Sequence, residues 1–550
     1  MASCHLPPAG FRGTWRDDDD ARALYSEAAG IGRIVPAAVA VPVDADDVVT
    51  IVRYAGERSL SVVPRGSGSS MAGGAIGPGV IIDLTRIDHI GPVDSSGHWL
   101  WAGPGALRGN VNRAAHERGL RFPVDPSSGE FCTIGGMAAT NAAGAHSLRF
   151  GPMRDWVLAL DCVFADGTRA VVSRLAPTPD GVPAIDALVK DVLPKLAEYS
   201  SESLGHAGVA KDSSGYALSQ YRHSGKLVDL LVGSEGTLAI IVGVQLALAP
   251  TAHSTSSVLG AFSSLDDAVG AAVDARNAGA VACELLDRTF LHVASLEDAA
   301  SSPVTALAGI PDGTEAVLLA EVEAGNAADA ETAALTLATM FHQQHATAVR
   351  VALGEIEQHE LWELRHAASP ILARLDPSLK SMQFIEDGAV PPEKLADYVR
   401  GVRAALDERQ VRGVIFGHAG DAHVHVNPLI DVASPDWREK AQELLQDIVR
   451  LTAELGGTLS GEHGDGRLRT PLLDQVWSED AMELFRIVKT AFDPAGILNP
   501  GVKVALPGQK PIGDVKYDPS LAPLPGRVRE ALDRMTDARA YSSLRLSLLD

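Results

Sequence analysis

The glycine- and serine-rich segment GSGSSMAGGAIG, residues 66–77, constrains the fold more than any other part of this chain. It follows the apolar segment SVVPR (61–65) and precedes GVIIDLT (79–85), which predicts two buried strands joined by a tight loop. Because the side chains are small, the backbone N–H groups of such a loop can approach an anion closely, as in a pyrophosphate-binding nest. A purely structural turn is the alternative, since glycine is also the usual residue of tight backbone geometry.

Two common nucleotide-binding motifs do not fit this loop. The Rossmann fingerprint GxGxxG requires a third glycine where Met71 stands. A P-loop requires lysine followed by serine or threonine after its last glycine, but here Gly73 is followed by Gly74. The loop therefore predicts phosphate binding of another kind, or a turn.

Apolar strand-like segments alternate with alanine-rich helical patterns through most of the 550 residues, which favours an α/β or α+β architecture in two or three domains. We predict a helix at 44–60, a hairpin in WVLALDCVFADGTRAV (156–171) and strand structure in LLVGSEGTLAIIVGVQLALAP (230–250). The composition changes after this last segment, so we place a domain boundary near residue 250.

Charge and cysteine content exclude several classes of protein. The formal net charge of −23 disfavours nucleic acid or anionic lipid as a general partner. The four cysteines, at 4, 132, 162 and 283, form no CxxC pair and predict neither a disulfide framework nor a zinc ribbon. No apolar run reaches transmembrane length, and the N-terminus lacks the apolar core of a signal peptide. We expect a cytoplasmic protein, with peripheral contact at the inner face of the membrane left open.

The segment GHAGDAHVHVN (417–427) contains three histidines within eight residues. If AHVHVN is a strand, His423, His425 and Asn427 face one way, and the preceding loop can bring His418 alongside His425. The segment SGEHGDGRLR (460–469) adds Glu462 and His463 between glycines.

Two imidazoles and a carboxylate form a ligand set suited to Zn²⁺, Mn²⁺ or Fe²⁺ that leaves coordination positions open for a substrate. The alternative is that each histidine only makes local hydrogen bonds.

Three segments together are similar to a known family: PRGSGSSMAGGA, VDPSSGEFCTIGGMAATNAAGAHSLRFG and VGSEGTLAIIVGVQLALAP. In order and spacing they resemble the FAD-binding domain of the vanillyl-alcohol-oxidase (PCMH-type) flavoproteins, and TAFDPAGILNPGVKV (490–504) resembles the closing motif of FAD-linked oxidases. The resemblance spans about residues 36–504 and implies bound FAD. Serines stand in the first loop where some relatives have a histidine that attaches the flavin, so noncovalent FAD is expected.

The resemblance also implies which residues contact FAD, mostly around its pyrophosphate. They are Arg65, Gly66, Ser67, Gly68, Ser69, Ser70, Pro126, Thr133, Gly135, Gly136, Thr140, Asn141, Gly144, Glu235, Gly236, Ile240 and Asn499.

GHAGDAHVHVN and GEHGDG further resemble the HxGDxxxH and EHG motifs of the D-2-hydroxyacid dehydrogenase branch, which includes D-lactate, glycolate and D-2-hydroxyglutarate dehydrogenases. The resemblance implies that His418, His425 and Glu462 bind a divalent metal, most simply Zn²⁺ or Mn²⁺, and that His463 is the catalytic base. Asn427 would contact the substrate or support the metal site, whereas His423 stands where relatives often have asparagine.

These residues fit the chemistry of alcohol oxidation. Hydride transfer from a secondary alcohol to flavin also requires removal of the O–H proton, and an unassisted alcohol is far too weak an acid at neutral pH. A metal at the alcohol oxygen favours the alkoxide, and His463 could accept the proton.

A 2-hydroxy acid also needs a group that binds its carboxylate. Relatives use an Arg-xxx-Thr pattern ahead of a lysine, which here corresponds to Arg365 and Ser369, with Lys380 aligning less cleanly. Surface ion pairing is the alternative for both Arg365 and Lys380.

We predict an α+β fold with a PCMH-type FAD-binding domain and an α+β substrate cap domain containing an antiparallel sheet. The predicted divisions are an N-terminal extension (1–35), the FAD domain (36–250), the cap domain with the metal site (251–490), a return to FAD (491–505) and a tail (506–550). The predicted function is oxidation of a D-lactate-like D-2-hydroxy acid to the 2-oxo acid.

Several alternatives stay open at this point. The substrate could be D-2-hydroxyglutarate or glycolate, the flavin could serve non-redox chemistry as in alkylglycerone-phosphate synthases, or the chain could be a flavin-binding electron-transfer or assembly subunit. No cysteine follows Cys283, so we expect no iron–sulfur domain in this chain and a separate acceptor that is not NAD: quinone, a cytochrome or an iron–sulfur protein. A homodimer is one option for the assembly.

Overall fold

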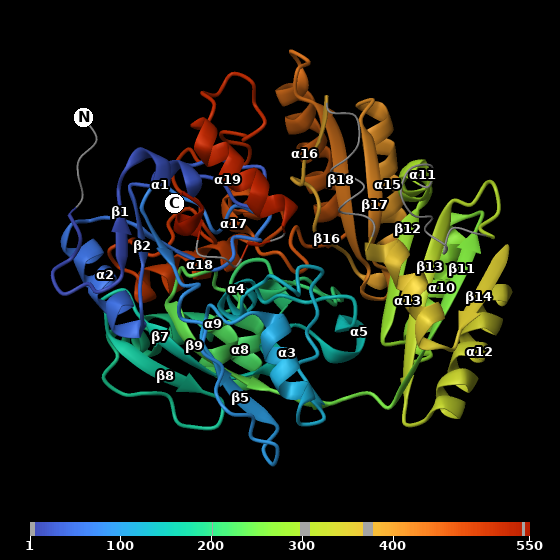
Figure 1. The fold of residues 1–550 in the computed structure, drawn as a ribbon, viewed down its shortest axis with the longest axis horizontal. Helices are drawn as coiled ribbons and strands as arrows, with labels where there is room; N and C mark the ends of the chain where they lie inside the picture. The colour runs from blue at the N-terminus through green and yellow to red at the C-terminus, as the bar shows by residue number, and fades with distance from the viewer. Residues whose placement is uncertain are drawn as a thin grey trace.

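The computed structural model describes residues 6–200, 202–297, 309–366, 378–538, 540–541 and 545–549. The chain forms two lobes built on separate β-sheets, as Figure 1 shows. The first lobe combines the described residues of 6–250 and 466–549, and the second lobe consists of the described residues of 254–464. Helices and largely antiparallel sheets occur in both lobes, which confirms the predicted α+β class.

The first sheet of the first lobe carries the glycine- and serine-rich loop. Its strands lie in the order β1 (Thr14–Arg16), β2 (Ala38–Val41), β4 (Val80–Asp83) and β3 (Val62–Arg65). Strands β3 and β4 are parallel neighbours, so the connection that contains the loop at 66–77 must lead from the end of β3 back to the start of β4. The helix α2 (Ala45–Glu57) packs its apolar side on this sheet, which confirms the predicted helix and both predicted strands.

The second sheet of this lobe is antiparallel, in the order β5 (Trp99–Ala102), β9 (Ile240–Ala247), β7 (Val157–Val163) and β8 (Arg169–Ser173). The predicted hairpin is β7–β8. The prediction of strand structure throughout 230–250 is wrong for its first half, because Glu235 and Gly236 have φ of 51° and 70°. Two successive left-handed residues cannot continue a strand, so 232–239 forms a turn before β9.

The second lobe holds one large antiparallel sheet. Its order within the described residues is β14 (Ala348–Ala352), β11 (Ser254–Phe262), β13 (Ala316–Ala324), β12 (Ala282–Asp287), β17 (Arg412–His418), β18 (His423–Asp431) and β15 (Leu379–Ser381), and β16 (Gly388–Ala389) also pairs with β18. The predicted AHVHVN strand is therefore confirmed.

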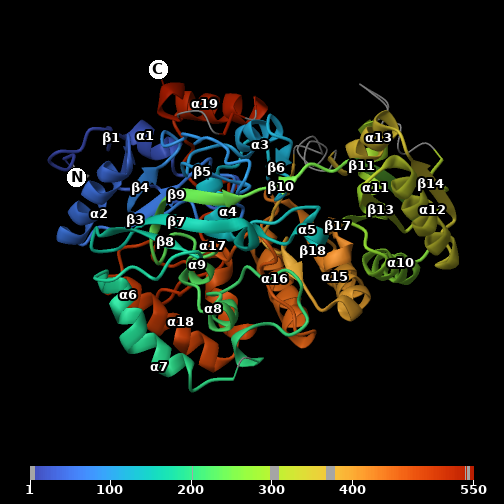
Figure 2. The same ribbon diagram turned by 90° about the horizontal axis from the view of Figure 1, so that it is seen from below.

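Helices cover both faces of this sheet. One face packs against α10 (Leu265–Asn277), α12 (Ala327–Gln343), α15 (Leu395–Glu408) and α16 (Trp437–Glu454), and the other against α11 (Arg288–Glu297) and α13 (Glu355–His366). Figure 2 shows α10, α12 and α13 at the end of the lobe remote from the first sheet.

The chain returns to the first lobe after the second. Helices α17 (Gly466–Arg469) and α18 (Glu479–Phe492) lead to a segment in which Leu498 bridges to Val62 of β3. Helix α19 (Gly526–Asp537) then packs on α1 (Asp19–Leu24). None of the helices in the described ranges is long and apolar enough to cross a membrane.

The remaining elements of the first lobe are short. They are α3 (Arg108–His116), β6 (Leu120–Arg121), α4 (Ile134–Thr140), α5 (Ser147–Phe150), α6 (Pro183–Ala187), α7 (Leu193–Leu196), α8 (Leu218–Ser224), α9 (Leu227–Leu231) and β10 (Ala249–Pro250).

Candidate functional site

Three histidines gather at the end of the β17–β18 hairpin. His418 pairs directly with His423 across the hairpin, and His425 follows two positions later on β18, so the pleat places all three on one face. The ring centroids of His418 and His423 are 5.3 Å apart, those of His418 and His425 5.4 Å, and those of His423 and His425 4.6 Å. A left-handed residue, Ala422 at φ 53°, closes the short turn. All three rings are buried.

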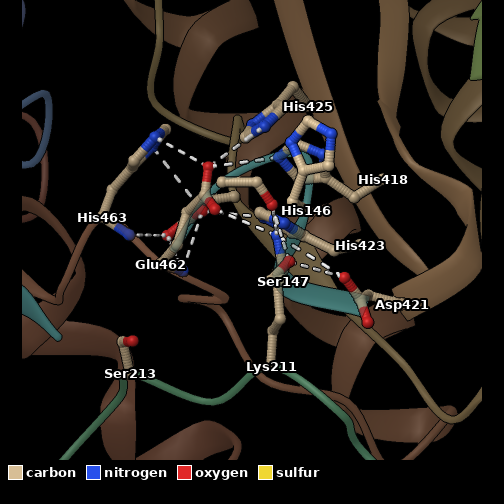
Figure 3. Close-up of polar contacts among 12 residues, drawn as sticks. His146, Ser147, Lys211, Ser213, His418, Asp421, His423, His425, Glu462 and His463 are labelled. Atoms are coloured by element: carbon tan, nitrogen blue, oxygen red, sulfur yellow. Dashed lines mark hydrogen bonds and ion pairs between the residues drawn. The ribbon is translucent and has the colours of Figure 1, made fainter. Parts of the chain in front are cut away.

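Glu462 enters this cluster from the loop that precedes α17, and one of its carboxylate oxygens faces three imidazoles (Figure 3). Its Oε1 lies 3.4 Å from His418 Nε2, 3.5 Å from His425 Nε2 and 3.5 Å from His463 Nε2. A tetrahedral shell with bonds of about 2.0–2.2 Å places its ligand atoms about 3.3–3.6 Å apart. The distances from Glu462 to His418 and His425 therefore match two edges of a metal shell.

The other ring nitrogen of His418 is held by a buried acid. Glu284 of β12 accepts at 2.5 Å from Nδ1, and its second oxygen accepts from Arg365 Nε at 2.5 Å. Burial by itself raises the pKa of Glu284, but the charges of His418 and Arg365 outweigh it and hold that pKa below its usual range. An ionised Glu284 fixes the ring so that Nε2 faces the cluster, as outer partners of metal-binding histidines do.

Hydrogen bonds also fix the rings of His425 and His423. His425 Nδ1 donates to the backbone oxygen of Glu386 at 2.8 Å, which leaves Nε2 for the cluster. His423 Nε2 lies 2.9 Å from Asp387 Oδ1, and its buried Nδ1 has no hydrogen-bond partner within the described residues. Burial lowers the pKa of His423 to about 3, so the ring is neutral at physiological pH. One nitrogen of each of the three histidines and one oxygen of Glu462 lie within 4.8 Å of one another.

Lys211 of the first lobe holds the second oxygen of Glu462. Its Nζ lies 3.1 Å from Glu462 Oε2, 3.2 Å from the Gly144 carbonyl oxygen and 3.8 Å from Asp421 Oδ2. Burial opposes ionisation of Glu462, but the charges of Lys211 and His418 hold its pKa well below the usual range. Lys211 therefore aims Oε1 at the histidines and connects the two lobes.

His463 lies at the edge of the cluster. Its Nδ1 is 2.6 Å from Glu386 Oε2, its ring stacks on His425 at 5.3 Å, and its side chain is 28% exposed. Burial alone would lower the pKa of His463, but the charges of Glu386 and Asp387 outweigh it and raise that pKa to about 10. A divalent cation nearby acts in the opposite direction. Nε2 is thus the nitrogen available to a substrate.

Arg365 on α13 is buried beneath the cluster rather than placed at the surface. Besides its bond to Glu284, its guanidinium lies 5.0 Å from the centre of the Phe416 ring. The surface ion-pair interpretation is therefore wrong for Arg365. Ser369, predicted beside it, lies outside the described residues.

Lys380 and Asn427 fall on opposite faces of the sheet. Lys380 pairs with Ile430, which is an odd number of residues from His425 and therefore points the other way. Paired residues share a face, so the geometry contradicts the predicted role of Lys380 at the cluster. Asn427, two residues after His425, is buried on the histidine face.

The two predicted cofactor loops touch closely in the first lobe. A Cβ atom added at Gly66 would lie 2.1 Å from Thr133 Oγ1, and a Cβ atom added at Gly135 would lie 2.6 Å from Pro104 Cβ. Thr133 is the N-cap of α4, and its hydroxyl accepts from Gly136 N at 3.4 Å. Only glycine leaves room for these neighbours.

Unsatisfied buried donors mark the first loop. Arg65 Nε, Ser70 Oγ and Arg545 Nη1 are buried and have no hydrogen-bond partner within the described chain. Buried polar groups are normally paired, so three such atoms around one loop fit a bound anion. The pyrophosphate of FAD would satisfy this requirement. The Arg65 side chain itself donates to backbone oxygens of Tyr25, Glu27 and Ala75, behind the loop.

Asn499 joins the segments predicted to surround FAD. Its Nδ2 donates to the carbonyl oxygens of Gly74 at 3.0 Å and Glu235 at 2.8 Å, and its Oδ1 accepts from Arg467 at 2.8 Å. The Glu235 carboxylate accepts from the backbone N–H of Asp465 at 2.7 Å. The structure therefore assigns both side chains to contacts within the protein.

The other predicted cofactor residues lie in these same elements. Ser67 and Ser69 share a contact of 3.2 Å between their hydroxyls, Gly68 has φ of 74°, and Thr140 donates to the Gly136 carbonyl. Asn141 ends α4 in the left-handed region. Pro126 lies in the turn before Phe131, and Gly144 lies in the loop beside Lys211. Gly236 lies in the turn before β9, and Ile240 begins β9.

Sequence reasoning missed several residues of the site: Lys211, Glu284, Glu386, Asp387, Arg467, Arg469 and Arg545. Only Arg467 and Arg469 could have been identified from the sequence, because they directly follow the GEHGDG motif. The others come from distant segments that no local pattern connects.

Two protein-family models match most of the chain. Residues 36–173 match the model described as "FAD binding domain", and residues 251–502 match "FAD linked oxidases, C-terminal domain". The chain is 29% identical over 500 residues to the glycolate oxidase subunit GlcD of Bacillus subtilis, covering 90% of this chain and 95% of that protein. It is 29% identical over 466 residues to a D-lactate dehydrogenase of Archaeoglobus fulgidus, covering 84% and 90%.

A D-2-hydroxyglutarate dehydrogenase of Pantoea ananatis is 31% identical over 531 residues, but the 91% of this chain that aligns spans only 51% of that protein. Among solved structures, an alkyldihydroxyacetonephosphate synthase has a TM-score of 0.60 at 16% identity, covering 88% of this chain and 82% of that one. A 4-ethylphenol oxidase from Gulosibacter chungangensis has a TM-score of 0.61 at 15% identity, covering 90% and 94%. These two structures show the shared fold alone.

Proposed function

Because the chain belongs to the PCMH-type family of FAD-linked oxidases, in its D-2-hydroxyacid dehydrogenase branch, we propose that it oxidises a D-lactate-like 2-hydroxy acid to the 2-oxo acid with the help of a divalent metal. The observation that supports the metal most directly is the position of Glu462 Oε1, which lies 3.4 Å and 3.5 Å from the Nε2 atoms of His418 and His425. Glycolate and D-2-hydroxyglutarate are the alternative substrates, because relatives with these names match as well.

His418, His425 and Glu462 would hold the metal, with His423 as a neutral neighbour in the same donor set. We favour Zn²⁺ or Mn²⁺, since the set mixes imidazole and carboxylate ligands. When bound, the metal supplies Lewis-acid stabilisation of the alkoxide and FAD supplies the hydride acceptor.

The chain's own residues move the proton. In its neutral form His463 can accept it at Nε2 from the substrate hydroxyl, and Glu386, 2.6 Å from Nδ1, stabilises the imidazolium that forms. Because the His463 side chain is 28% exposed, the proton can leave to solvent from there.

Arg365 is proposed to bind the substrate carboxylate with the guanidinium N–H groups that Glu284 does not use. Asn427 lies on the same face of the sheet as the histidines and is proposed as a further substrate contact.

FAD is proposed to be noncovalent, so acid precipitation would release the flavin into the supernatant. Electrons would pass to a separate acceptor that is not NAD: quinone, a cytochrome or an iron–sulfur protein.

Anaerobic bleaching of the flavin tests the proposal. D-Lactate, glycolate, D-2-hydroxyglutarate and longer 2-hydroxy acids are mixed singly with the metal-loaded holoenzyme, and the absorbance near the flavin maximum is followed. We expect rapid bleaching by D-lactate or a close homologue and none by the L-enantiomer. If no hydroxy acid bleaches a flavin that dithionite does reduce, the chain is an electron-transfer or assembly subunit instead.

A further inference from the structure

The carboxyl-terminal segment folds back onto the first sheet, next to the cofactor loop. Helix α19 packs on α1, and the side chains of Leu532, Met535 and Leu546 share a core with Val63 of β3. Figure 1 shows α19 and the C-terminus beside α1 and β1. This segment lies beyond residue 502, where the matched family model ends.

Arg545 is the residue of this segment that reaches the loop. It is 2% exposed, its Nη2 donates to the Ser67 carbonyl oxygen at 3.2 Å, and its guanidinium lies 5.8 Å from the centre of the Tyr25 ring. Its Nη1 is buried and has no hydrogen-bond partner in the described ranges. The neighbouring Leu546 is anchored in the core, so the position of Arg545 is fixed by packing.

Arg65 forms a second buried guanidinium behind the same loop. Its Nη1 donates to the backbone oxygens of Tyr25 and Ala75 and its Nη2 to that of Glu27, whereas its Nε has no hydrogen-bond partner within the described residues. A Cβ atom added at Gly68 would lie 2.5 Å from Nη2. Burial, and then the charge of Arg545, lower the pKa of Arg65 to about 9.

Neither guanidinium has an ion-pair partner in the part of the chain that the structure describes. Among the residues that the structure describes, every hydrogen bond of Arg65 and Arg545 goes to a backbone oxygen. The nearby Asp83 is engaged by the Tyr25 hydroxyl and by Thr85. Buried charges are normally paired, so this arrangement favours an anion close to the loop.

The contact with Ser67 also sets the direction of an N–H group. In a trans peptide, the C=O of one residue and the N–H of the next point in opposite directions. Because Arg545 holds the Ser67 carbonyl, the Gly68 N–H points away from the carboxyl-terminal segment. A charged donor on the carbonyl also polarises the peptide and strengthens that N–H as a donor.

We propose that Arg545 is a positioning residue for the diphosphate of FAD: it holds the loop at 66–70 from behind, turns the Gly68 N–H toward the phosphates and, with Arg65, supplies the positive potential that they need. The carboxyl-terminal segment is therefore part of the cofactor site. The inference requires FAD but is independent of the proposed substrate and metal.

The test measures cofactor affinity rather than turnover. FAD is removed from the full-length protein, and its Kd is measured by flavin fluorescence for the wild type, Arg545→Gln, Arg545→Lys and the control Arg534→Gln. Arg534 donates to the Leu548 carbonyl at 3.2 Å, so the control loosens the same segment without touching the loop. Loss of a charge-assisted hydrogen bond is expected to weaken FAD binding about 10- to 100-fold in Arg545→Gln. Arg545→Lys should recover part of this affinity, and Arg534→Gln should match the wild type.

ADP and adenosine separate a diphosphate effect from a general loss of stability. Arg545→Gln should weaken competition by ADP but not by adenosine, and hydrogen exchange of the wild-type apoprotein should show protection of both 66–70 and 545–549 on adding ADP. The proposal fails if Arg545→Gln binds FAD as the wild type does, or if Arg534→Gln loses as much. It fails equally if ADP protects the loop without the carboxyl-terminal segment, a measurement that needs no variant.

Discussion

The histidine cluster of the second lobe and the cofactor loop of the first lobe are built in opposite ways. In the cluster, His418, His423 and His463 each have a ring nitrogen paired with a buried acid. In the loop, Arg65 and Arg545 are buried cations whose hydrogen bonds, among the residues that the structure describes, all go to backbone oxygens.

The difference shows how each region selects the charge of its ligand. Carboxylates around the imidazoles attract a cation and fix the rings before it arrives. A backbone loop with guanidinium groups behind it attracts an anion and offers N–H groups in front. Changes to one region are therefore expected to leave the ligand of the other in place.

Removal of the metal should distinguish the roles of the two regions most clearly. A chelator is expected to abolish flavin reduction by the hydroxy acid while FAD stays bound, and Zn²⁺ or Mn²⁺ should restore reduction. His425→Ala should behave like the chelated protein, because it deletes a proposed ligand, and His423→Ala should have a milder effect. Elemental analysis beside stopped-flow reduction rates measures both effects. A metal-free wild type that reduces its flavin at full rate would contradict the metal proposal.

His463→Ala should slow the reaction without releasing the metal or FAD. The proposed base is lost, so flavin reduction should slow by about 10²–10⁴-fold while metal content and FAD content stay at wild-type levels. His342→Ala, an exposed histidine on α12, is the matched control. Loss of metal together with rate would show that His463 is a ligand rather than the base.

Arg365→Ala tests whether the second lobe also binds the substrate anion. Loss of one partner of a desolvated charge pair costs about 2–5 kcal/mol, so kcat/KM should fall at least about tenfold for every 2-hydroxy acid. Arg350→Ala, which removes a more exposed pair with Glu360, is the control. If metal content falls in parallel, Arg365 acts through Glu284 and the carboxylate assignment is wrong.

Lys211→Met probes the contact between the regions. Because Lys211 holds Oε2 of Glu462, its loss should weaken metal binding by about 10- to 100-fold, as is typical of residues behind metal ligands, while FAD affinity is unchanged. Lys195→Met, a change at an exposed pair with Glu198, should leave metal affinity unaltered. Titration of the apoprotein with Zn²⁺ against a competing chelator measures the difference.

The smallest effect is expected at the pH-sensitive contact between the lobes. His146 lies 2.5 Å from Asp125 and 3.0 Å from Glu321, and it stacks on Trp362. Burial by itself lowers the pKa of His146, but the charges of Asp125 and Glu321 raise it well above 6.5. The stabilisation is therefore complete below pH 6.5 and is lost as pH rises through the higher folded-state pKa.

His146→Gln should remove this contribution. Its Tm is expected to fall by about 1–2 °C at pH 6 and to converge with that of the wild type in the alkaline range. Thermal unfolding from pH 6 to 10 measures the difference, with exposed His342→Gln as control. Equal Tm values at pH 6 would show that the ion pairs contribute nothing.

Much of the fold could be predicted because its signals are local. The periodicity of 44–60, the apolar segments on both sides of 66–77 and the alternation in AHVHVN each lie within a short window, and each formed the expected element. The segment 230–239 was mispredicted because its apolar residues resemble a strand, whereas the left-handed Glu235 and Gly236 form a turn. The resemblance of motifs then added the family, which the comparisons confirm.

By itself, the sequence determined the residues that lie together within a motif: His418 and His425 with their shared face, and Glu462 with His463. The tertiary structure decided their partners, because Lys211, Glu284, Glu386 and Arg545 reach the two regions from other elements. It also turned Lys380 to the other face of its sheet. The physical reason is that buried charges need partners, and close packing supplies them from whichever segments the fold brings within a few ångströms, regardless of their separation along the chain.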